Sequence, residues 1–143
     1  MTIRILIVDD HARVRAGLRL ILEEQQDFQV VGEAVNGREG TAMALALNPD
    51  VIIMDVNMPV LNGIEATRLL CERSPLVKIL ILSFDHSREN FLRALRYGAR
   101  GCLLKDSAAD EVVTAVRSIM EGTLFFGAGI VRPHSRAAAG APP

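Results

Sequence analysis

Short, almost uninterrupted apolar runs alternate along this chain with longer segments in which apolar residues recur every three or four positions. A continuous apolar run of this kind is typical of a strand buried on both faces, whereas the wider spacing is typical of a helix packed on one side. The alternation predicts βαβ units and a parallel sheet. The strand-like runs are Ile3–Val8, residues 28–35, Val51–Asp55, Lys78–Ser83 and Gly101–Leu104.

Capping and turn residues set the ends of the expected helices. Each helical segment follows one strand-like run, which gives five helices in strict alternation with five strands. The first expected helix includes residues 14–22, and the second runs from Asn36-Gly37 to about Leu47, where Asn48-Pro49 closes it. The third covers residues 64–73, and the fourth lies between Ser87 and Gly98. The fifth starts at Ser107 in a capping-box-like pattern and stops at Gly122.

Right-handed crossovers allow few topologies for this pattern. We expect an α/β fold with a doubly wound, five-stranded parallel sheet in the order 2-1-3-4-5. The carboxyl ends of its strands then lead into Asp9, Asp10, Asp55, Ser83 and Lys105. Ligands of open α/β sheets bind at this edge, and the first and third strands are neighbours at the point where the order reverses.

Composition narrows the function classes. The 143 residues suffice for one domain, and the net charge of −1 gives no reason to expect nucleic-acid or membrane binding. The two cysteines, Cys71 and Cys102, form no CxxC pattern, which argues against a zinc site and for a reducing compartment. The first residues do not resemble a signal peptide, and no apolar stretch approaches the roughly 18 residues of a membrane span. We therefore expect a cytoplasmic protein.

Each polar residue at the strand ends has an ordinary explanation when taken alone. The acidic pair could form a turn or cap a helix, Ser83 could be a turn hydroxyl, and Lys105 could be a solvated surface lysine. Together they fall at the same end of different strands, where three carboxylates repel each other unless a cation compensates. Carboxylate oxygens suit a hard cation such as Mg²⁺. The pattern therefore predicts a site for Mg²⁺ and a phosphoryl group.

The motifs around these residues resemble the receiver domains of bacterial two-component response regulators. They are the acidic pair, MDVNMPVLNG around Asp55, the LS after the fourth strand and GCLLKDS after the fifth. The phrases VDDH and LLKDSAADE resemble most the NarL/FixJ-type (LuxR-family) regulators. The resemblance covers about residues 3–122 and implies the flavodoxin-like receiver fold.

The resemblance also implies roles for individual residues. The domain would be a phosphorylation-activated switch with only self-directed phosphotransfer and autodephosphorylation, and not a turnover enzyme. Asp55 would accept the phosphoryl group. Asp10 would bind Mg²⁺ directly and Asp9 through water, and the backbone carbonyl of Asn57 would be a further metal ligand. Lys105 would pair with Asp55 and then with the phosphoryl oxygens, and Ser83 would hydrogen-bond the phosphoryl group and shift on activation.

Partners and domain organisation follow from the same resemblance. A sensor histidine kinase would donate the phosphoryl group, and phosphorylation would favour a homodimer. Residues 1–122 would form the receiver. Residues 123–143, which become Pro-, Ala- and Gly-rich from about Arg132, would be an extension that leads to a helix-turn-helix domain, the only part expected to bind DNA. The alternative is a stand-alone receiver that acts through protein–protein contacts.

Two positions depart from the commonest receiver pattern. Cys102 replaces the Tyr or Phe often found three residues before the lysine, and Asp106 replaces the proline often found after it. We expect the Lys105–Asp106 bond to be trans. We also expect the signal to leave mainly through Ser83, residues 84–87 and the fourth helix, while Cys102 stays buried.

Other interpretations remain open or are disfavoured. His11 is expected to be a loop residue because imidazole suits Mg²⁺ poorly. A dinucleotide-binding domain would need GxGxxG after the first strand, and a haloacid-dehalogenase-type phosphatase would need DxDxT; neither pattern occurs there. A degenerate module should lack one of the site residues, but all of them are present. A group of arginines forms either a solvated face or a partner surface: Arg88, Arg93, Arg96 and Arg100.

Overall fold

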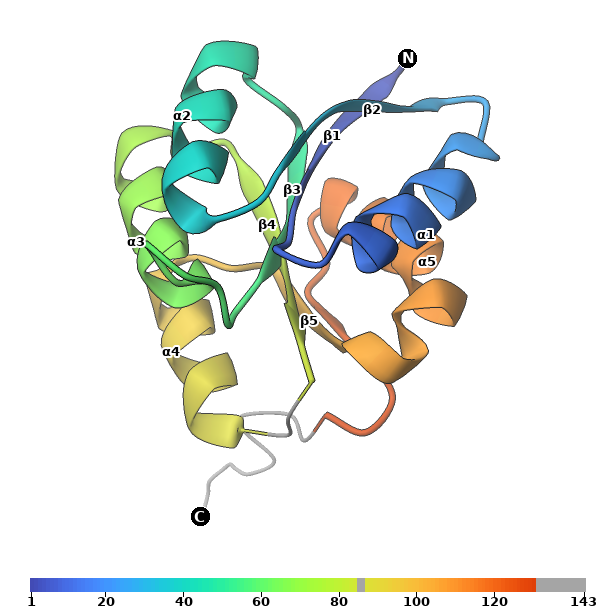
Figure 1. Cartoon of the computed structure of the whole chain (residues 1–143). Coiled ribbons are helices and arrows are strands. Elements are labelled where there is room, and N and C mark those ends of the chain that lie inside the picture. Colours follow the sequence, from blue (N-terminus) through green and yellow to red (C-terminus); the bar gives the residue numbers. More distant parts are fainter. Residues whose placement is uncertain (85–86, 131–143) are drawn as a thin grey trace.

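A computed structural model describes residues 1–84 and 87–130 as a parallel sheet with helices on both faces (Figure 1). The strand order is β2-β1-β3-β4-β5-β6, and every neighbouring pair is parallel. The strands are β1 (Ile3–Val8), β2 (Phe28–Ala34), β3 (Val51–Asp55), β4 (Lys78–Ser83), β5 (Gly101–Leu104) and β6 (Phe125–Phe126). The helices are α1 (Ala12–Glu23), α2 (Gly37–Leu47), α3 (Gly63–Arg73), α4 (Arg88–Tyr97) and α5 (Ala108–Met120).

The order predicted for the first five strands is confirmed, but the sheet has a sixth strand that the sequence pattern missed. β6 is only two residues long and pairs with β5, Gly101 lying opposite Phe125 and Cys102 opposite Phe126. It lies after the expected receiver boundary at Gly122, so the expected extension over 123–143 begins with a strand. The remainder of that extension, residues 131–143, lies outside the described residues.

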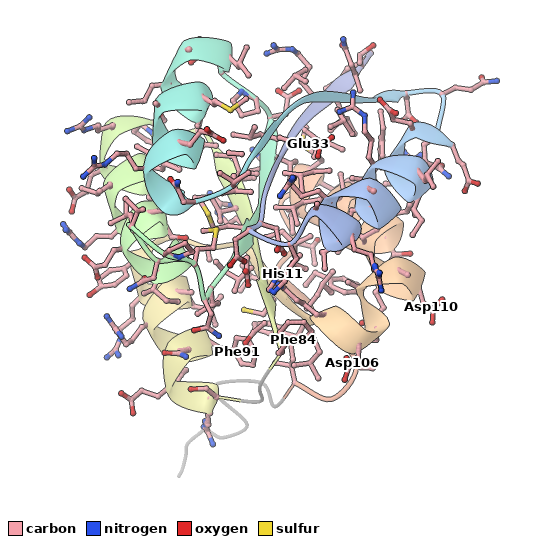
Figure 2. The ribbon with its side chains drawn as sticks, in the orientation of Figure 1. His11, Glu33, Phe84, Phe91, Asp106 and Asp110 are labelled. Carbon is pink, nitrogen blue, oxygen red and sulfur yellow. The ribbon has the colours of Figure 1, made fainter. Side chains whose placement is uncertain are left out.

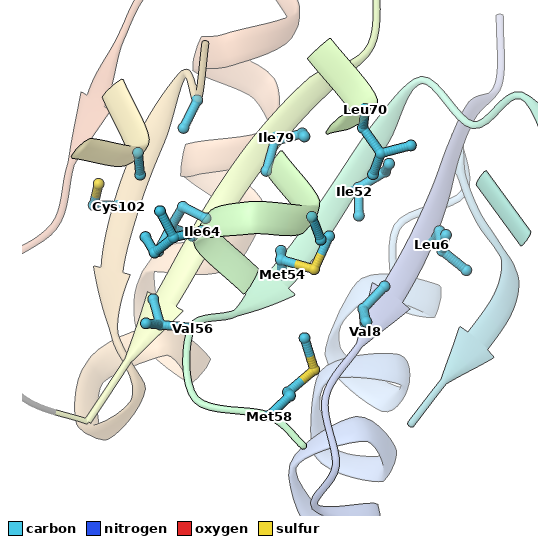
Figure 3. Close-up of a cluster of buried hydrophobic side chains, with 14 of the residues drawn as sticks. Leu6, Val8, Ile52, Met54, Val56, Met58, Ile64, Leu70, Ile79 and Cys102 are labelled. Atoms are coloured by element: carbon cyan, nitrogen blue, oxygen red, sulfur yellow. The ribbon is translucent and has the colours of Figure 1, made fainter. Parts of the chain in front are cut away.

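Alternation along the strands divides the core into two halves, because successive strand residues point to opposite faces. Even-numbered β1 residues such as Leu6 and Val8 pack with α2, α3 and α4, a core that Figure 3 shows in close-up. Odd-numbered residues such as Ile5 and Ile7 pack with α1 and α5 on the opposite face. Strands covered on both sides explain the continuous apolar runs.

Most predicted helix ends are confirmed by their capping geometry. The side chain of Asn36 accepts a hydrogen bond from the Glu39 amide at the start of α2. Ser87 does the same for Asn90 at the start of α4, and Gly98 ends that helix with a φ of 117°. Glycine adopts such a left-handed conformation without a Cβ clash.

The capping box predicted at Ser107 is wrong. Lys105–Ser107 form a 3₁₀ turn, and Ser107 has φ −116° and ψ 6°. An N-cap side chain needs an extended backbone to reach back to the helix amides, and this turn removes that geometry. The Ser107 hydroxyl instead donates to Glu111 Oε1 over 3.1 Å.

Strand register brings the sequence-predicted polar residues to one edge. Val8 lies opposite Met54, Asp55 opposite Leu82, and Ser83 opposite Leu104. The residues that follow β1, β3, β4 and β5 therefore lie at the same end of the sheet. Among residues 1–84 and 87–130, no helix combines the length and apolar character that crossing a bilayer requires.

Candidate functional site

Three charged side chains share one side of this edge because of strand alternation. Asp9, Asp55 and Lys105 each lie two residues beyond an apolar residue that packs against α1 and α5: Ile7, Ile53 and Leu103. Strand periodicity directs residues two apart to the same face of a sheet. The two carboxylates and the ammonium therefore converge at the carboxyl ends of β1, β3 and β5.

Lys105 holds the two carboxylates together. Its Nζ lies 2.8 Å from Asp9 Oδ2 and 3.1 Å from Asp55 Oδ2, and the three side chains are 3%, 0% and 2% exposed. Neither of these oxygens accepts a well-directed hydrogen bond from a described residue, although both contact the ammonium. The carboxylates thus keep unused acceptor capacity in a buried place, where an unsatisfied polar atom is costly.

The carboxyl group of Asp55 has a pKa well above that of an ordinary aspartate. Burial, and then the charge of Asp9, raise the pKa of Asp55 to about 6, while Lys105 and the Asn57 amide oppose the rise. Buried carboxylates generally shift in this direction because the charged form loses its hydration. Above pH 6 the group is a carboxylate whose charge is incompletely compensated, which favours the approach of a further cation.

Asp10 and His11 complete the acidic end of the site. Ligand atoms of Asp9, Asp10, His11 and Asp55 all lie within 4.8 Å of one another. The His11 Nδ1 is 3.2 Å from both Asp9 Oδ1 and Asp10 Oδ1. His11 lies in the loop before α1, as expected, but the structure also places its ring against the acidic pair. The Asp10 side chain is 30% exposed and reaches solvent.

The loop after β3 is fixed to Asp55 by close packing. The Gly63 amide donates to the Val56 carbonyl over 2.9 Å, and Asn62 caps α3 by accepting from the Glu65 amide. A Cβ on Gly63 would lie 1.9 Å from the Asp55 carbonyl oxygen, so only glycine fits there. The Asn57 amide also makes a long contact of 3.4 Å with Asp55 Oδ1. The start of α3 therefore sets the position of the Asp55 backbone.

Ser83 and Cys102 lie in different surroundings. Ser83 is the last residue of β4, is buried, and lies at the same edge as Asp55. Cys102 is fully buried in the core beneath α2, α3 and α4, and burial raises the pKa of its thiol to about 12. The peptide bond between Lys105 and Asp106 is trans, as predicted.

Two contributors were missed by reasoning from sequence. The Phe84 ring lies against His11 and Lys105, and Arg15 on α1 donates to the Asp9 carbonyl oxygen over 2.7 Å. Figure 2 shows Phe84 beside His11 at this edge. Phe84 lies two residues beyond Leu82, which packs against α1 and α5, so the alternation that placed Lys105 was an available signal for Phe84.

The ion pair described for the arginines around α4 involves none of the site residues. Arg93 contacts Glu65 of α3 at 3.6 Å, and Arg88 and Arg96 are exposed. A surface hollow of about 350 Å³ lies at the opposite end of the sheet, where Pro49 precedes β3 and Lys78 begins β4. Its lining lacks the clustered carboxylates of the carboxyl edge, so the chemistry favours that edge.

Comparison with known proteins agrees with this geometry. A family model described as the response regulator receiver domain matches residues 5–117. The transcriptional regulatory protein DegU of Brevibacillus brevis is 42% identical over 124 residues, covering 87% of this chain and 52% of DegU. The nitrate/nitrite response regulator protein NarL of Escherichia coli (strain K12) is 38% identical over 122 residues, covering 85% of this chain and 56% of NarL. The chain thus spans about half the length of these relatives.

Solved structures share the fold. The crystal structure of a LuxR-family two-component response regulator from Aurantimonas sp. SI85-9A1 matches with a TM-score of 0.83 and 34% identity, covering 87% of this chain and 89% of that one. The isolated REC domain of RcsB from Salmonella enterica serovar Typhimurium, determined in the presence of the phosphomimetic BeF3⁻, matches with a TM-score of 0.81 and 25% identity, covering 88% and 94%.

Proposed function

The chain belongs to the response regulator receiver family, with relatives of the NarL and LuxR type, and we propose that it is a switch in which Asp55 accepts the phosphoryl group. The observation that carries this proposal is the buried triad of Asp9, Asp55 and Lys105, in which a carboxylate with a raised pKa contacts an ammonium. A phosphohistidine of a sensor histidine kinase, or a small acyl phosphate, would be the donor.

The transfer needs little covalent chemistry from the protein. A carboxylate oxygen of Asp55 forms a bond to phosphorus, the bond from phosphorus to the imidazole nitrogen of the donor breaks, and the imidazole takes up a proton. At neutral pH Asp55 is ionised, because its pKa of about 6 lies below that pH. Lys105 already lies 3.1 Å from Asp55 and is placed to contact the transferring oxygens. The product is an acyl phosphate on the chain itself.

The residues present fit Mg²⁺. Carboxylate oxygens are ligands that this hard cation prefers, and two buried oxygens, Asp9 Oδ2 and Asp55 Oδ2, accept no well-directed hydrogen bond from a described residue. Asp10 reaches solvent and suits direct binding, whereas Asp9 is enclosed by Lys105 and His11 and suits an indirect role. The Asn57 carbonyl is the further proposed ligand. When bound, Mg²⁺ would neutralise charge on the phosphoryl oxygens.

Ser83 is the proposed sensor of the phosphoryl group. Its place at the end of β4, beside the Asp55 edge, lets a small movement of its hydroxyl follow a new oxygen on Asp55. Cys102 stands where many receivers have a larger Tyr or Phe as the second switch residue, and we propose that it stays in the core. The domain thereby carries out its own phosphorylation and autodephosphorylation without turning over a free substrate.

The output of the switch is proposed from the relatives, of which DegU is named a transcriptional regulatory protein and which are about twice as long as the matched part. A DNA-binding domain beyond Pro143 would be controlled by phosphorylation, with a homodimer as the active form. A receiver that works alone through protein contacts is the alternative, and the reading frame that follows Pro143 distinguishes the two.

Intact-mass spectrometry tests the chemistry. With acetyl phosphate and Mg²⁺, the wild-type chain should gain one phosphoryl group and Asp55→Asn should gain none. Lys105→Ala should still bind Mg²⁺ but label poorly, because the ammonium that faces the transferring oxygens is gone. Equal labelling of wild type and Asp55→Asn would contradict the assignment of Asp55, and repeated turnover of the donor would indicate an enzyme instead.

A further inference from the structure

The phenyl ring of Phe84 lies against the ammonium group of Lys105. Nζ is 4.5 Å from the ring centre, a distance at which a cation is attracted to the ring face. The same ring meets the imidazole of His11 edge to face, with centroids 5.9 Å apart and ring planes at 78°. Figure 2 shows the two rings together at the carboxyl edge of the sheet.

The exposures of Phe84 and Lys105 are the reverse of what their polarity favours. The Phe84 residue is 53% exposed, whereas the Lys105 side chain is 3% exposed. An exposed phenyl group leaves hydrophobic stabilisation unused, and a buried ammonium loses hydration. The ring takes the place of water beside an ammonium that also contacts two carboxylates and lies 3.5 Å from the His11 Nδ1.

The position of the ammonium matters for the chemistry of Asp55. Lys105 begins a 3₁₀ turn beyond β5, and its flexible side chain must span to β1 and β3 to contact Asp9 and Asp55. A ring face that attracts the ammonium and excludes water narrows the positions open to it. Charge interactions are also stronger where water is excluded.

We propose that Phe84 is a positioning residue, whose ring holds the ammonium of Lys105 beside Asp55 so that it is in place for phosphoryl oxygens. This inference rests on the proposed function and deepens it, since it assigns control of the phosphoryl site to a residue outside the acid and lysine set. Two variants separate the ring from simple bulk: Phe84→Tyr keeps the aromatic face, and Phe84→Leu keeps apolar volume without it.

The first measurement does not depend on phosphorylation. In NMR spectra of the unphosphorylated chain, the ε-protons of Lys105 should be shifted upfield by the ring current of Phe84. The shift should persist in Phe84→Tyr and vanish in Phe84→Leu. Leu20→Ala, which truncates an exposed apolar side chain on α1, is the matched control and should leave the shift unchanged. A wild-type chain without the upfield shift would overturn the proposal.

The second measurement is the affinity for beryllofluoride in the presence of Mg²⁺. Phe84→Leu should bind about three- to tenfold more weakly than wild type, and Phe84→Tyr should bind equally well. In a Lys105→Met background, Phe84→Leu should cause no further loss, since the ring acts through the ammonium. Wild-type affinity in Phe84→Leu, or an equal loss in both backgrounds, would refute the inference. A wild-type chain with the ring-current shift but no beryllofluoride binding would contradict the proposed function and still support the positioning of Lys105 by Phe84.

Discussion

Arg15 donates a hydrogen bond from Nη1 to the backbone carbonyl oxygen of Asp9 across 2.7 Å, and so ties helix α1 to the strand end that carries the acidic pair. The Nε of the same guanidinium donates to Glu33 Oε1 on β2, 3.0 Å away. Hydrogen bonds from Arg19 and then from Arg15 lower the pKa of Glu33 against the opposing effect of burial. A carboxylate on β2 thus anchors the arginine that fixes the backbone before Asp10.

Replacing Arg15 should weaken metal binding although every proposed ligand residue is kept. Arg15→Lys keeps the positive charge but cannot bond Asp9 and Glu33 through one planar fork, so we expect Mg²⁺ affinity to fall by roughly tenfold in calorimetric titration. Arg19→Lys is the matched control, because Arg19 makes its hydrogen bonds to Glu23 and Glu33. Equal Mg²⁺ affinity in the two variants would show that the bond to Asp9 does not position the site.

Asp55 should destabilise the metal-free protein above pH 6. Its pKa of about 6 lies above the ordinary value of 3.8, so the folded state binds the proton more tightly than the unfolded state. The stability from this proton is complete below about pH 4 and is lost as pH rises through 6. Asn does not titrate, so Asp55→Asn should be more stable than wild type by about 2–3 kcal/mol at pH 7.5 and by much less at pH 4.5.

Urea unfolding at both pH values in the presence of EDTA measures this difference. Added Mg²⁺ should stabilise wild type at pH 7.5 more than Asp55→Asn, because a ligand that binds only the folded state adds stability according to its affinity. If the difference in free energy of unfolding between wild type and Asp55→Asn were the same at both pH values, the charge of ionised Asp55 would not be its cause.

The strand positions were predictable because polar residues end the apolar runs abruptly. The bounds of β3, β4 and β5 match the prediction to the residue, since Asp55, Ser83 and Lys105 each mark the change. β6 could not be found in this way. Two phenylalanines are too short a pattern, and they form a strand only because β5 offers an unpaired edge beside them.

The site was predictable in its charged residues and less so in their surroundings. Parallel topology brings strand ends together, so Asp9, Asp55 and Lys105 follow from the strand order. Alternation indicates on which side of the edge Phe84 lies. The contacts that Phe84 and Arg15 make there depend on side-chain rotamers and on how α1 and the end of β4 approach the edge, which periodicity does not encode. The difference in burial between Asp9 and Asp10, which supports their proposed roles, likewise becomes visible only in the three-dimensional structure.

Gly63→Ala should disrupt the site through the backbone. The added Cβ would meet the carbonyl oxygen and carbon of Asp55 at 1.9 and 2.8 Å, so α3 or the end of β3 has to move. We expect a loss of about 3 kcal/mol or more in urea unfolding, and weaker phosphorylation. Gly17→Ala is the control, because Gly17 lies inside α1 and no heavy atom lies within 4 Å of the added Cβ. The free energy of unfolding of this variant should rise by about 0.5–1 kcal/mol. Similar stabilities for the two variants would contradict the close packing at Gly63.

Cys102 should resist thiol reagents in both states of the switch. Its side chain is fully buried, and burial raises the pKa of the thiol to about 12, so little of the reactive thiolate forms at neutral pH. Cys71 is only partly buried, although burial also raises its pKa. In a Cys71→Ser variant, which leaves Cys102 as the single cysteine, iodoacetamide labelling should be slow and limited by unfolding. Cys102→Ser, which leaves Cys71, should label faster and is the matched comparison.

The same labelling of Cys71→Ser should become no faster when beryllofluoride and Mg²⁺ are added. A small apolar side chain on β5 that is buried in one cluster with residues of β4 and α4 gains nothing by leaving the core, so Cys102 should stay in place while Ser83 responds to the phosphoryl mimic. Slower labelling is also expected if the bound state unfolds less often. Faster labelling on addition of beryllofluoride would show that Cys102 swings outward on activation, and the signal would then pass through β5 rather than through Ser83 and the residues after it.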